Sequence, residues 1–411
     1  MSGAPVGGAP VSGARAGDPA TDRARGSADI DVAALRRDEF AWMTAGDQVY
    51  LNAASTGPLP ARTIATAAEW AARRAQPHRI GDAEQMEILA TTRAHVAALV
   101  GADVAEIALA PNTSYGINVA ARALPLAPGD VVVSVDREFP ANVYPWMAQA
   151  ARGVRFEQLA CVDDLPDEEA LLRAVARPEV KAVTVSWVQF SSGHRVDLAR
   201  LGALCRACEK WLVVDAIQGV GAVPLDLAAL HVDVLACGMQ KWLLAPWGTG
   251  FVYVRRALHE VLPPPDVGWL AVRGADDYSR LVDYDFTLRD DARRFEVGTL
   301  AYEAFAAATA SLALLHALGP DAVAAHVVRL CDAIVAWAAS RDDVRLVTRP
   351  ERARRGGIVS VAPRDPVAAS RRLRAAGIVH SLREGAIRLA PHCYNTEEDV
   401  ARALAVLGEG A

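Results

Sequence analysis

The chain has 411 residues, of which 52% are hydrophobic and 22% are charged, and its formal net charge at pH 7 is −6. This length suits one large and one smaller domain, and the hydrophobic fraction is high enough to form sizeable cores. The negative net charge gives no electrostatic footprint for nucleic acid, so we expect no nucleic-acid partner.

The first 28 residues are rich in Gly, Ala, Pro and Ser, and they lack the apolar central stretch of a signal peptide. Such a composition cannot bury enough apolar surface to offset the entropy of ordering, so we expect a disordered tail over residues 1–28. We find no apolar run that reaches the length of a membrane span. The sequence therefore predicts a cytoplasmic protein that makes no membrane contact.

The chain has six irregularly spaced cysteines. Cys205 and Cys208 form a C-x-x-C pair, but no second pair of cysteines or histidines accompanies them. They lie in an apolar periodic segment that reads as a helix. We interpret the pair as part of a packed helix in a reducing cytosol, and we predict no metal site.

Helical periodicity covers residues 30–42, and a short strand is expected at 49–51. Apolar runs then alternate with helical patterns. The expected strands are 107–109, 131–135, 182–187, 212–214, 234–236 and 251–254. The expected helices among them are 114–123, 141–151 and 198–210. This alternation predicts βαβ units and a mostly parallel sheet that is covered on both faces.

The last third of the chain changes character. Residues 301–338 carry a long helical pattern, and strands and helices then mix. The expected strands are 344–347, 357–361, 379–382 and 387–390, and the expected helices are 367–376 and 397–407. We therefore predict a large domain over 61–298, a small α+β domain over 299–411, and an N-terminal segment over 29–60 that packs on the small domain.

Three loops that follow expected strands carry polar residues. Thr113 and Ser114 enter a helix, where hydroxyls and free N–H groups suit a phosphate, although ordinary helix capping also explains them. Asp215 ends an apolar strand, where a carboxylate needs a cationic or donor partner unless it is a helix cap.

Lys241 lies in the third of these loops, after the expected strand 234–236, and precedes apolar residues. A lysine among apolar groups has a lowered pKa and becomes a usable amine nucleophile. The alternative is a surface lysine whose stem lies along apolar surface.

Together, in this order, these loops resemble the class V aminotransferase family of fold-type I pyridoxal 5′-phosphate (PLP) enzymes. The motifs that carry the resemblance are 51–54 (LNAA), 112–114 (NTS), 138–142 (EFPAN), 214–221 (VDAIQGVG), Asp233, 238–241 (GMQK), 248–250 (GTG), 294–299 (RFEVGT) and 388–398. The resemblance covers about residues 51–406. It implies an α/β fold with a mostly parallel, seven-stranded sheet in the large domain, a small α+β domain, and PLP as the cofactor.

The resemblance implies a role for each residue that matches a motif. Lys241 forms the Schiff base with PLP and later moves the α-proton as acid or base. Asp215 pairs with the protonated pyridine nitrogen and keeps the ring an electron sink, and Gln218 donates to the ring's phenolic oxygen. Phe139 occupies the place where many relatives stack a histidine on the ring, so the aromatic platform is kept and an ionisable group is lost.

The phosphate-binding positions of the family match Thr113, Ser114 and Gln240. Thr299 resembles a threonine that reaches the phosphate of the neighbouring subunit, which implies a homodimer with shared active sites.

The substrate is implied to be a small amino acid. Arg388 matches the arginine that grips its α-carboxylate, because a guanidinium fork fits a carboxylate with two parallel hydrogen bonds. A buried structural salt bridge is the alternative for Arg388. Asn52 is a further candidate for contact with the carboxylate. Trp187 and Trp247 are candidates for pocket walls or for core.

The histidines His194 and His392 could assist proton transfer, although a lone histidine is more often structural.

The residues assigned above are shared by the different reactions of PLP enzymes, so they do not indicate which reaction this protein catalyses. Cysteine desulfurases carry a reactive cysteine upstream of the carboxylate-binding arginine, but no cysteine lies between Cys331 and Cys393 here, and the turn at 383–385 is too short for an extra catalytic loop. Residues 186–193 and 394–396 look closest to the epimerase-like and lyase-like branch of the family. We therefore predict a PLP-dependent lyase or eliminase that acts on a β-substituted L-amino acid without a persulfide cysteine.

Two alternatives stay open. The first is an aminotransferase or epimerase of the same family, in secondary metabolism. The second is a catalytically silent protein with this fold that serves as a binding or regulatory subunit, which the presence of Lys241, Asp215, Gln218 and Arg388 disfavours.

Overall fold

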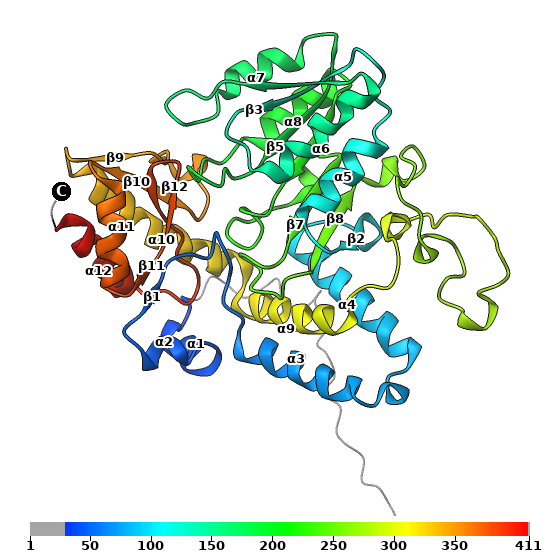
Figure 1. Ribbon diagram of the computed structural model, residues 1–411, viewed down its shortest axis with the longest axis horizontal. Helices are drawn as coiled ribbons and strands as arrows, with labels where there is room; N and C mark the ends of the chain where they lie inside the picture. The colour runs from blue at the N-terminus through cyan, green and yellow to red at the C-terminus, as the bar shows by residue number, and fades with distance from the viewer. Residues whose placement is uncertain (1–28, 410–411) are drawn as a thin grey trace, which may run out of the picture.

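The computed structural model describes residues 29–409, so the predicted disordered tail lies outside the described residues. A seven-stranded sheet forms its centre, with the strand order β2-β8-β7-β6-β5-β3-β4 (Figure 1). The strands are β2 (Ile107–Ala110), β3 (Val131–Val135), β4 (Arg155–Leu159), β5 (Val180–Ser186), β6 (Trp211–Asp215), β7 (Val234–Gly238) and β8 (Gly250–Val254). Only β8 runs antiparallel to its neighbours, so the mostly parallel α/β fold is confirmed.

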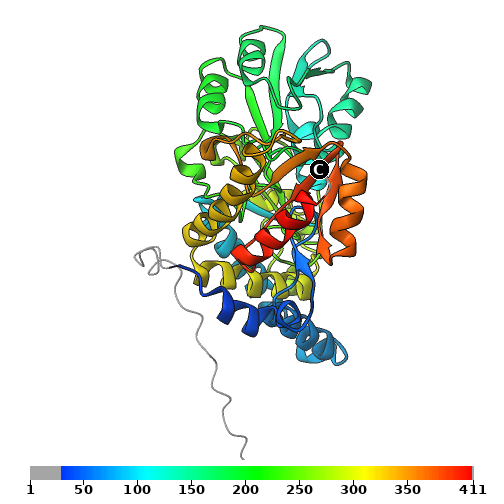
Figure 2. The same cartoon turned by 90° about the vertical axis from the view of Figure 1, so that its left-hand side faces the viewer.

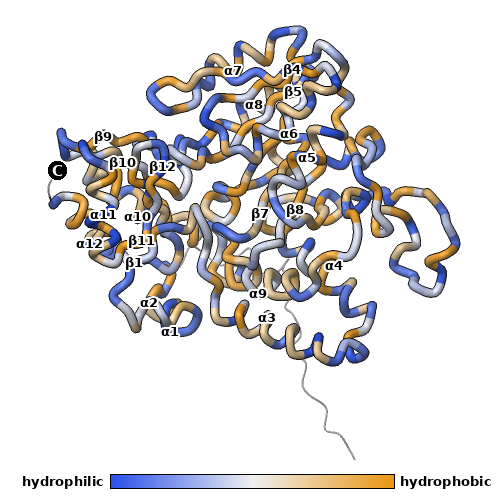
Figure 3. The backbone as a smooth tube through the Cα atoms, in the orientation of Figure 1, coloured by the Kyte–Doolittle hydropathy of each residue, from blue (hydrophilic) through white to orange (hydrophobic). Residues whose placement is uncertain are grey.

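Both faces of this sheet are buried. Successive strand residues point to opposite faces, and on β6 Val213 joins one apolar cluster while Leu212 and Val214 join the other. The helices α5 (Thr113–Ala123) and α6 (Tyr144–Met147) contribute to the first cluster. The helices that contribute to the second include α4 (Asp82–Val100), α7 (Glu168–Val175), α8 (Leu198–Ala207) and α9 (Tyr302–Leu318). In Figure 3, hydrophilic residues recur along the outer loops.

A four-stranded antiparallel sheet follows in the C-terminal part, with the order β12-β13-β10-β9 (Figure 2). Its elements are β9 (Val344–Leu346), β10 (Val359–Pro363), β12 (Ser381–Arg383) and β13 (Ala386–Leu389), with the helices α10 (Pro320–Ala339), α11 (Pro366–Ala375) and α12 (Glu397–Gly408). Near the N-terminus, β1 (Val49–Tyr50) pairs in parallel with β11 (Ile378–Val379). The N-terminal segment is therefore fixed to the C-terminal part, while the domain boundaries themselves stay a prediction.

Two expected helices are interrupted. The pattern over 30–42 gives α1 (Val32–Glu39) and α2 (Trp42–Ala45), because the chain turns at Phe40, which is buried against Tyr394 at 5.1 Å between ring centroids. The pattern over 301–338 gives α9 and α10, because Gly319 adopts φ +83° and Pro320 begins a new helix.

Other local expectations are also corrected. The expected helix 141–151 is two 3₁₀ turns around the four-residue α6, since Pro140 and Pro145 have no N–H to donate. The expected strand 379–382 divides at His380, where the chain leaves β11 and enters β12. The edge strand β4 and the helices α3 (Ala61–Arg74), α4 and α7 were not predicted.

By length and composition, the helix α10 could cross a membrane, contrary to the expectation from the sequence. However, 56% of its most apolar stretch is buried inside the molecule. A helix in the core of a folded domain can have the same length and composition.

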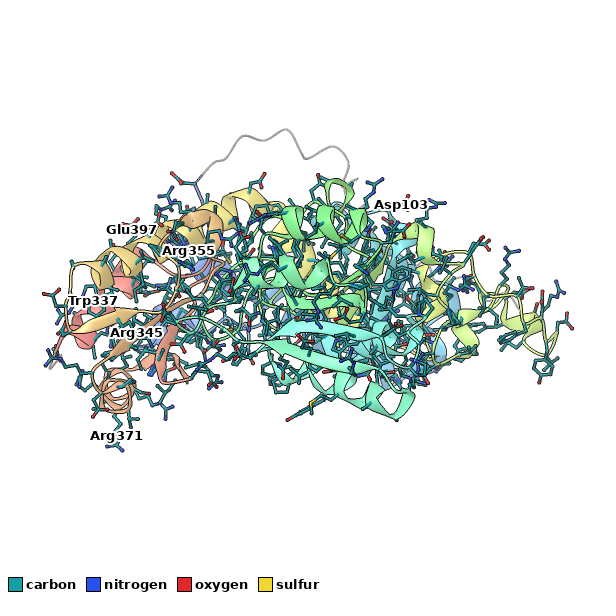
Figure 4. All side chains as sticks on the ribbon, turned by 90° about the horizontal axis from the view of Figure 1, so that it is seen from above. Asp103, Trp337, Arg345, Arg355, Arg371 and Glu397 are labelled. Atoms are coloured by element: carbon teal, nitrogen blue, oxygen red, sulfur yellow. The ribbon has the colours of Figure 1, made fainter. Side chains whose placement is uncertain are left out.

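The loop after β5 joins the two sheets. Ser191 and Ser192 offer carbonyl oxygens that accept hydrogen bonds of 2.5 Å from the hydroxyls of Ser360 and Thr348, which belong to the C-terminal part. Arg345 of β9, labelled in Figure 4, forms an ion pair of 2.9 Å with Asp164 across the same boundary. The carboxyl ends of β5, β6 and β7 therefore open toward a fixed C-terminal sheet.

Candidate active site

Lys241 lies in the turn directly after β7, at the boundary between the two sheets. Gly57 packs on this turn so closely that a Cβ there would lie 2.1 Å from the Lys241 carbonyl oxygen, and its N–H donates to the Gln240 carbonyl oxygen at 2.8 Å. Only glycine fits at this approach. The N-terminal segment thus holds the lysine turn in place.

The Lys241 amine is in an apolar environment. Burial lowers its pKa to about 8, Asp215 opposes this shift, and Arg388 adds to it. Its Nζ lies 5.5 Å from the centre of the Phe139 ring. A neutral amine is the form that attacks a carbonyl group, so this environment suits a Schiff-base lysine.

Asp215 ends β6 beside Lys241 and is 2% exposed. Its carboxylate accepts a hydrogen bond of 3.0 Å from the Ile217 N–H, and among the described residues no Lys, Arg or His lies within ion-pair distance of it. Burial raises its pKa to about 6. A buried carboxylate without a counter-ion is costly, and a bound cationic group would offset that cost.

Gln218 follows Asp215 and is fixed at both ends of its amide. Its Oε1 accepts from Trp242 Nε1 and its Nε2 donates to the Ala54 carbonyl oxygen, both at 2.9 Å. The amide group has a second hydrogen that neither contact uses.

The N-terminus of α5 meets the end of β7. Asn112 caps the helix by accepting from the Tyr115 N–H at 2.9 Å, so neither Thr113 nor Ser114 is the cap. Thr113 Oγ1 accepts from the Gly238 N–H at 2.9 Å, which leaves its own hydrogen for another acceptor. Ser114 is exposed at the same helix start.

Gln240 lies close to this helix start. A Cβ added at Gly238 would lie 2.5 Å from Gln240 Oε1, so the Gln240 side chain folds back over Gly238. The three predicted phosphate-binding residues are therefore brought together at a helix N-terminus, where anions are stabilised.

Phe139 stands on the loop after β3, and its side chain is 43% exposed. Its ring meets the edge of Phe190 at 5.4 Å between centroids. A large apolar ring that stays open next to the lysine amine is a surface on which a flat aromatic cofactor can stack.

Arg388 on β13 is 2% exposed. Its Nη1 donates to the Phe190 carbonyl oxygen and its Nη2 donates to Ser55 Oγ, each at 2.7 Å, while Nε has no partner. No Asp or Glu of the described residues lies within ion-pair distance, so the salt-bridge alternative is not seen. Burial lowers the Arg388 pKa to about 10.

Asn52 is linked to Arg388 through two serines. Its Oδ1 accepts from Ser381 Oγ at 2.8 Å, and Ser381 Oγ lies 3.0 Å from Ser55 Oγ. Neither serine was singled out from the sequence, because hydroxyl residues in loops and short strands carry no distinctive pattern.

Three other candidates have no side-chain contact with these groups, although the Trp187 N–H donates to the Asp215 carbonyl oxygen at 2.8 Å. Thr299 is exposed between the last 3₁₀ turn and α9. Trp187 belongs to the apolar core, where its ring fills the space over Gly219. Trp247 is 75% exposed, so it is not core.

The two histidines considered for proton transfer have structural contacts. His194 lies 2.7 Å from a carboxylate oxygen of Glu168. His392 uses Nε2 on the Trp242 carbonyl oxygen at 3.0 Å and Nδ1 on the Cys393 N–H, and burial lowers its pKa to about 4.

Glu138, directly before Phe139, was quoted only as part of a motif. It is buried and accepts hydrogen bonds from the Ser186 N–H at 2.7 Å and from Gln189 Nε2 at 2.9 Å. The sequence signal that could have found Glu138 is its position, as an acidic residue between the core strand β3 and the aromatic Phe139.

These residues fit PLP. The lysine amine matches the aldehyde of that cofactor, and the buried carboxylate without a counter-ion matches its ring nitrogen. The open aromatic ring matches the ring face, and the helix N-terminus matches the phosphate. No group of three or more potential metal ligands gathers anywhere in residues 29–409.

Comparison with known proteins agrees with this geometry. The model of the family described as "Aminotransferase class-V" matches residues 49–402. The chain is 31% identical over 325 residues to the uncharacterized aminotransferase YcbU of Bacillus subtilis, which covers 78% of this chain and 83% of that protein. It is 29% identical to the isopenicillin N epimerase of Streptomyces clavuligerus, over 86% of this chain and 92% of that one.

Solved structures share the fold. A mutant of C-DES with glycine covalently linked to its PLP cofactor has a TM-score of 0.81 at 22% identity, covering 90% of this chain and 98% of that one. A cysteine desulfurase from Thermococcus onnurineus has a TM-score of 0.80 at 21% identity, covering 93% and 98%. The fold is that of the fold-type I PLP enzymes. The chain belongs to the class V aminotransferase family, and PLP is its cofactor.

The pKa of Lys241 can be tested because the chain has only three lysines. Incubating cofactor-free protein with PLP, reducing with borohydride and mapping the modified peptides reports each lysine separately. Because the neutral amine reacts, we expect Lys241 labelling to rise with pH and reach half its maximum near pH 8. An ordinary lysine is still mostly protonated there. Lys181 and Lys210 are internal controls, and a Lys241 profile that coincides with theirs would contradict the assignment.

Proposed function

We propose that this protein is a PLP-dependent lyase or eliminase that acts on a β-substituted L-amino acid. The observation that carries the proposal is that two buried groups near Lys241, Asp215 and Arg388, have no ion-pair partner among the described residues. A cofactor with a cationic ring nitrogen and a substrate with a carboxylate supply the two missing charges. When bound, PLP supplies an electron sink for the substrate's α-carbon.

The residues around the cofactor have separate tasks in this proposal. Lys241 holds PLP as a Schiff base and moves the proton at the substrate's α-carbon. Asp215 holds the proton on the ring nitrogen, the spare amide hydrogen of Gln218 serves the phenolic oxygen, and Phe139 stacks on the ring face. Thr113, Ser114 and Gln240 bind the phosphate.

The substrate is held at its carboxylate. Arg388 has a free Nε–H, and its Nη2 contact is with Ser55, a hydroxyl that a stronger anionic acceptor can replace. Asn52 orients this end through Ser381. Trp187 is buried beside Asp215 and stays a candidate for the inner wall of the pocket.

The cysteines favour elimination over persulfide transfer. Cys331 and Cys393 are fully buried, and burial raises the pKa of each thiol. A thiol in its neutral form is a weak nucleophile. Sulfur or another leaving group is therefore expected to depart directly from the β-carbon.

Epimerisation and transamination remain the second candidate, since an isopenicillin N epimerase is among the relatives. A two-base inversion needs a titratable group on the face opposite the lysine. The Phe139 ring, 5.5 Å from the Lys241 amine, stands where many relatives carry a histidine, and it exchanges no proton. This favours the lyase.

We further propose a homodimer with shared active sites, in the cytoplasm. Thr299 would reach the partner's phosphate. The segment before it exposes large apolar side chains that a second subunit would cover, namely Leu281, Val282, Tyr284 and Phe286.

The reaction type is tested by following the absorption of the cofactor with a panel of L-amino acids while keto-acid and ammonia are assayed. A lyase returns to the starting spectrum while both products accumulate. A spectrum that moves to the pyridoxamine form and stays there until keto-acid is added would identify a transaminase instead. Lys241→Ala should abolish turnover, and turnover at the wild-type rate in that variant would refute the site.

Arg388→Gln tests carboxylate binding. Loss of a bidentate, buried guanidinium contact should lower kcat/KM by about 10²–10³-fold, mostly through KM. The matched control is Arg371→Gln on α11, an exposed arginine whose loss should matter by less than about 5-fold. Equal losses in both variants would contradict a specific role for Arg388.

A further inference from the structure

Glu138 is a buried acid that the roles assigned above do not use. Its side chain is 6% exposed, and Oε1 accepts from the Ser186 N–H and from Gln189 Nε2, while Oε2 pairs with the Ser186 hydroxyl. Both backbone and amide contacts donate to the carboxylate. Donors favour the charged form of an acid, but burial outweighs them here and raises the Glu138 pKa to about 7, so the carboxylate is ionised above neutral pH.

No cation of the described residues balances this charge. The nearest cationic side chain on its own segment, Arg137, turns to Asp164 at 2.9 Å and is partly exposed. The other ionisable neighbours are Asp136, two residues before Glu138, and the Cys161 thiol after β4, and neither carries a positive charge.

Glu138 is instead coupled to Asp215. Ser186, which donates to Glu138, is the direct partner of Asp215 in the parallel pairing of β5 and β6. The Asp215 charge raises the pKa of Glu138, which burial brings to about 7. The two acids are therefore linked through Ser186 at the end of the sheet.

We propose that Glu138 is a positioning residue whose carboxylate, when ionised, favours the protonated state of the cofactor that Asp215 binds. The same carboxylate fixes the loop that carries Phe139 to the end of β5 and to Gln189, next to Phe190. Glu138 thus acts on the charge near Asp215 and on the position of the Phe139 ring. The inference rests on the site residues proposed above and is independent of the reaction type.

Glu138→Gln separates the charge from the packing. An amide keeps one oxygen for Ser186 N–H and Gln189, and its NH₂ group can donate to the Ser186 hydroxyl, so the contacts are kept while the charge is lost. Ser186→Ala is the matched control, because it removes the hydroxyl contact and keeps the charge. Glu157→Gln on the edge strand β4 controls for removing any carboxylate.

The measurement is a pH titration of the visible absorption of the PLP-loaded protein without substrate. Losing the negative charge makes the protonated cofactor less stable, so the midpoint in Glu138→Gln should fall by about 0.5–1 pH unit. The two controls should stay within about 0.2 unit of wild type. An unchanged midpoint in Glu138→Gln overturns the proposal, as does an equal shift in Ser186→Ala, since the effect would then be structural.

Discussion

The site depends on buried charges that the chain leaves without counter-ions. Asp215 and Glu138 at the end of the central sheet, and Arg388 on the C-terminal sheet, have hydrogen-bond donors or acceptors but no opposite charge within ion-pair distance among residues 29–409. Elsewhere the chain pairs such groups. Arg93 and Glu296, both buried, meet at 2.7 Å, and Asp233 meets Arg255 at the same distance. Unpaired buried charges are costly, so their presence in one place indicates a site that binds a ligand of opposite charge.

The fold makes this arrangement possible by bringing two sheets together. Asp215 and Lys241 come from adjacent strands of the large sheet, whereas Arg388 comes from a strand that lies more than 140 residues further along the chain. The Phe190 loop joins them, because its backbone is held by Ser360 and Thr348 and its carbonyl oxygen receives Arg388. The position of the carboxylate-binding group is thus set by contacts between the sheets.

Much of the fold could be predicted from the sequence, and the elements that could not be predicted were missed for physical reasons. The strands of the large sheet are buried on both faces, so continuous apolar runs located β3, β6 and β7 well. The half-exposed edge strand β4 has no such run and was missed. Gly319 and Pro320, which divide α9 from α10, were present in the sequence but lay inside a strong apolar pattern.

The active site likewise contains residues that could be predicted from the sequence and residues that could not. Lys241, Asp215, Gln218 and Arg388 could be named because each stands in a motif that resembles those of the class V aminotransferases. The serines that position Arg388 and the acid behind Phe139 could not be assigned roles, because their effect depends on long-range contacts between segments. Trp187 was named as a possible pocket residue, but its burial over Gly219 depends on packing that a single tryptophan in a sequence does not reveal.

The most direct test of the central claim is the stability of the cofactor-free protein with Asp215→Asn. Burial raises the Asp215 pKa to about 6, so the ionised side chain costs stability above that pH. At pH 8 the variant should be more stable to urea by about 1–3 kcal/mol, with the gain shrinking below pH 6. Asp233→Asn, which breaks a pair with Arg255, should instead lose stability. If Asp215→Asn is as stable as wild type or less stable at pH 8, the buried charge is compensated and the account is wrong.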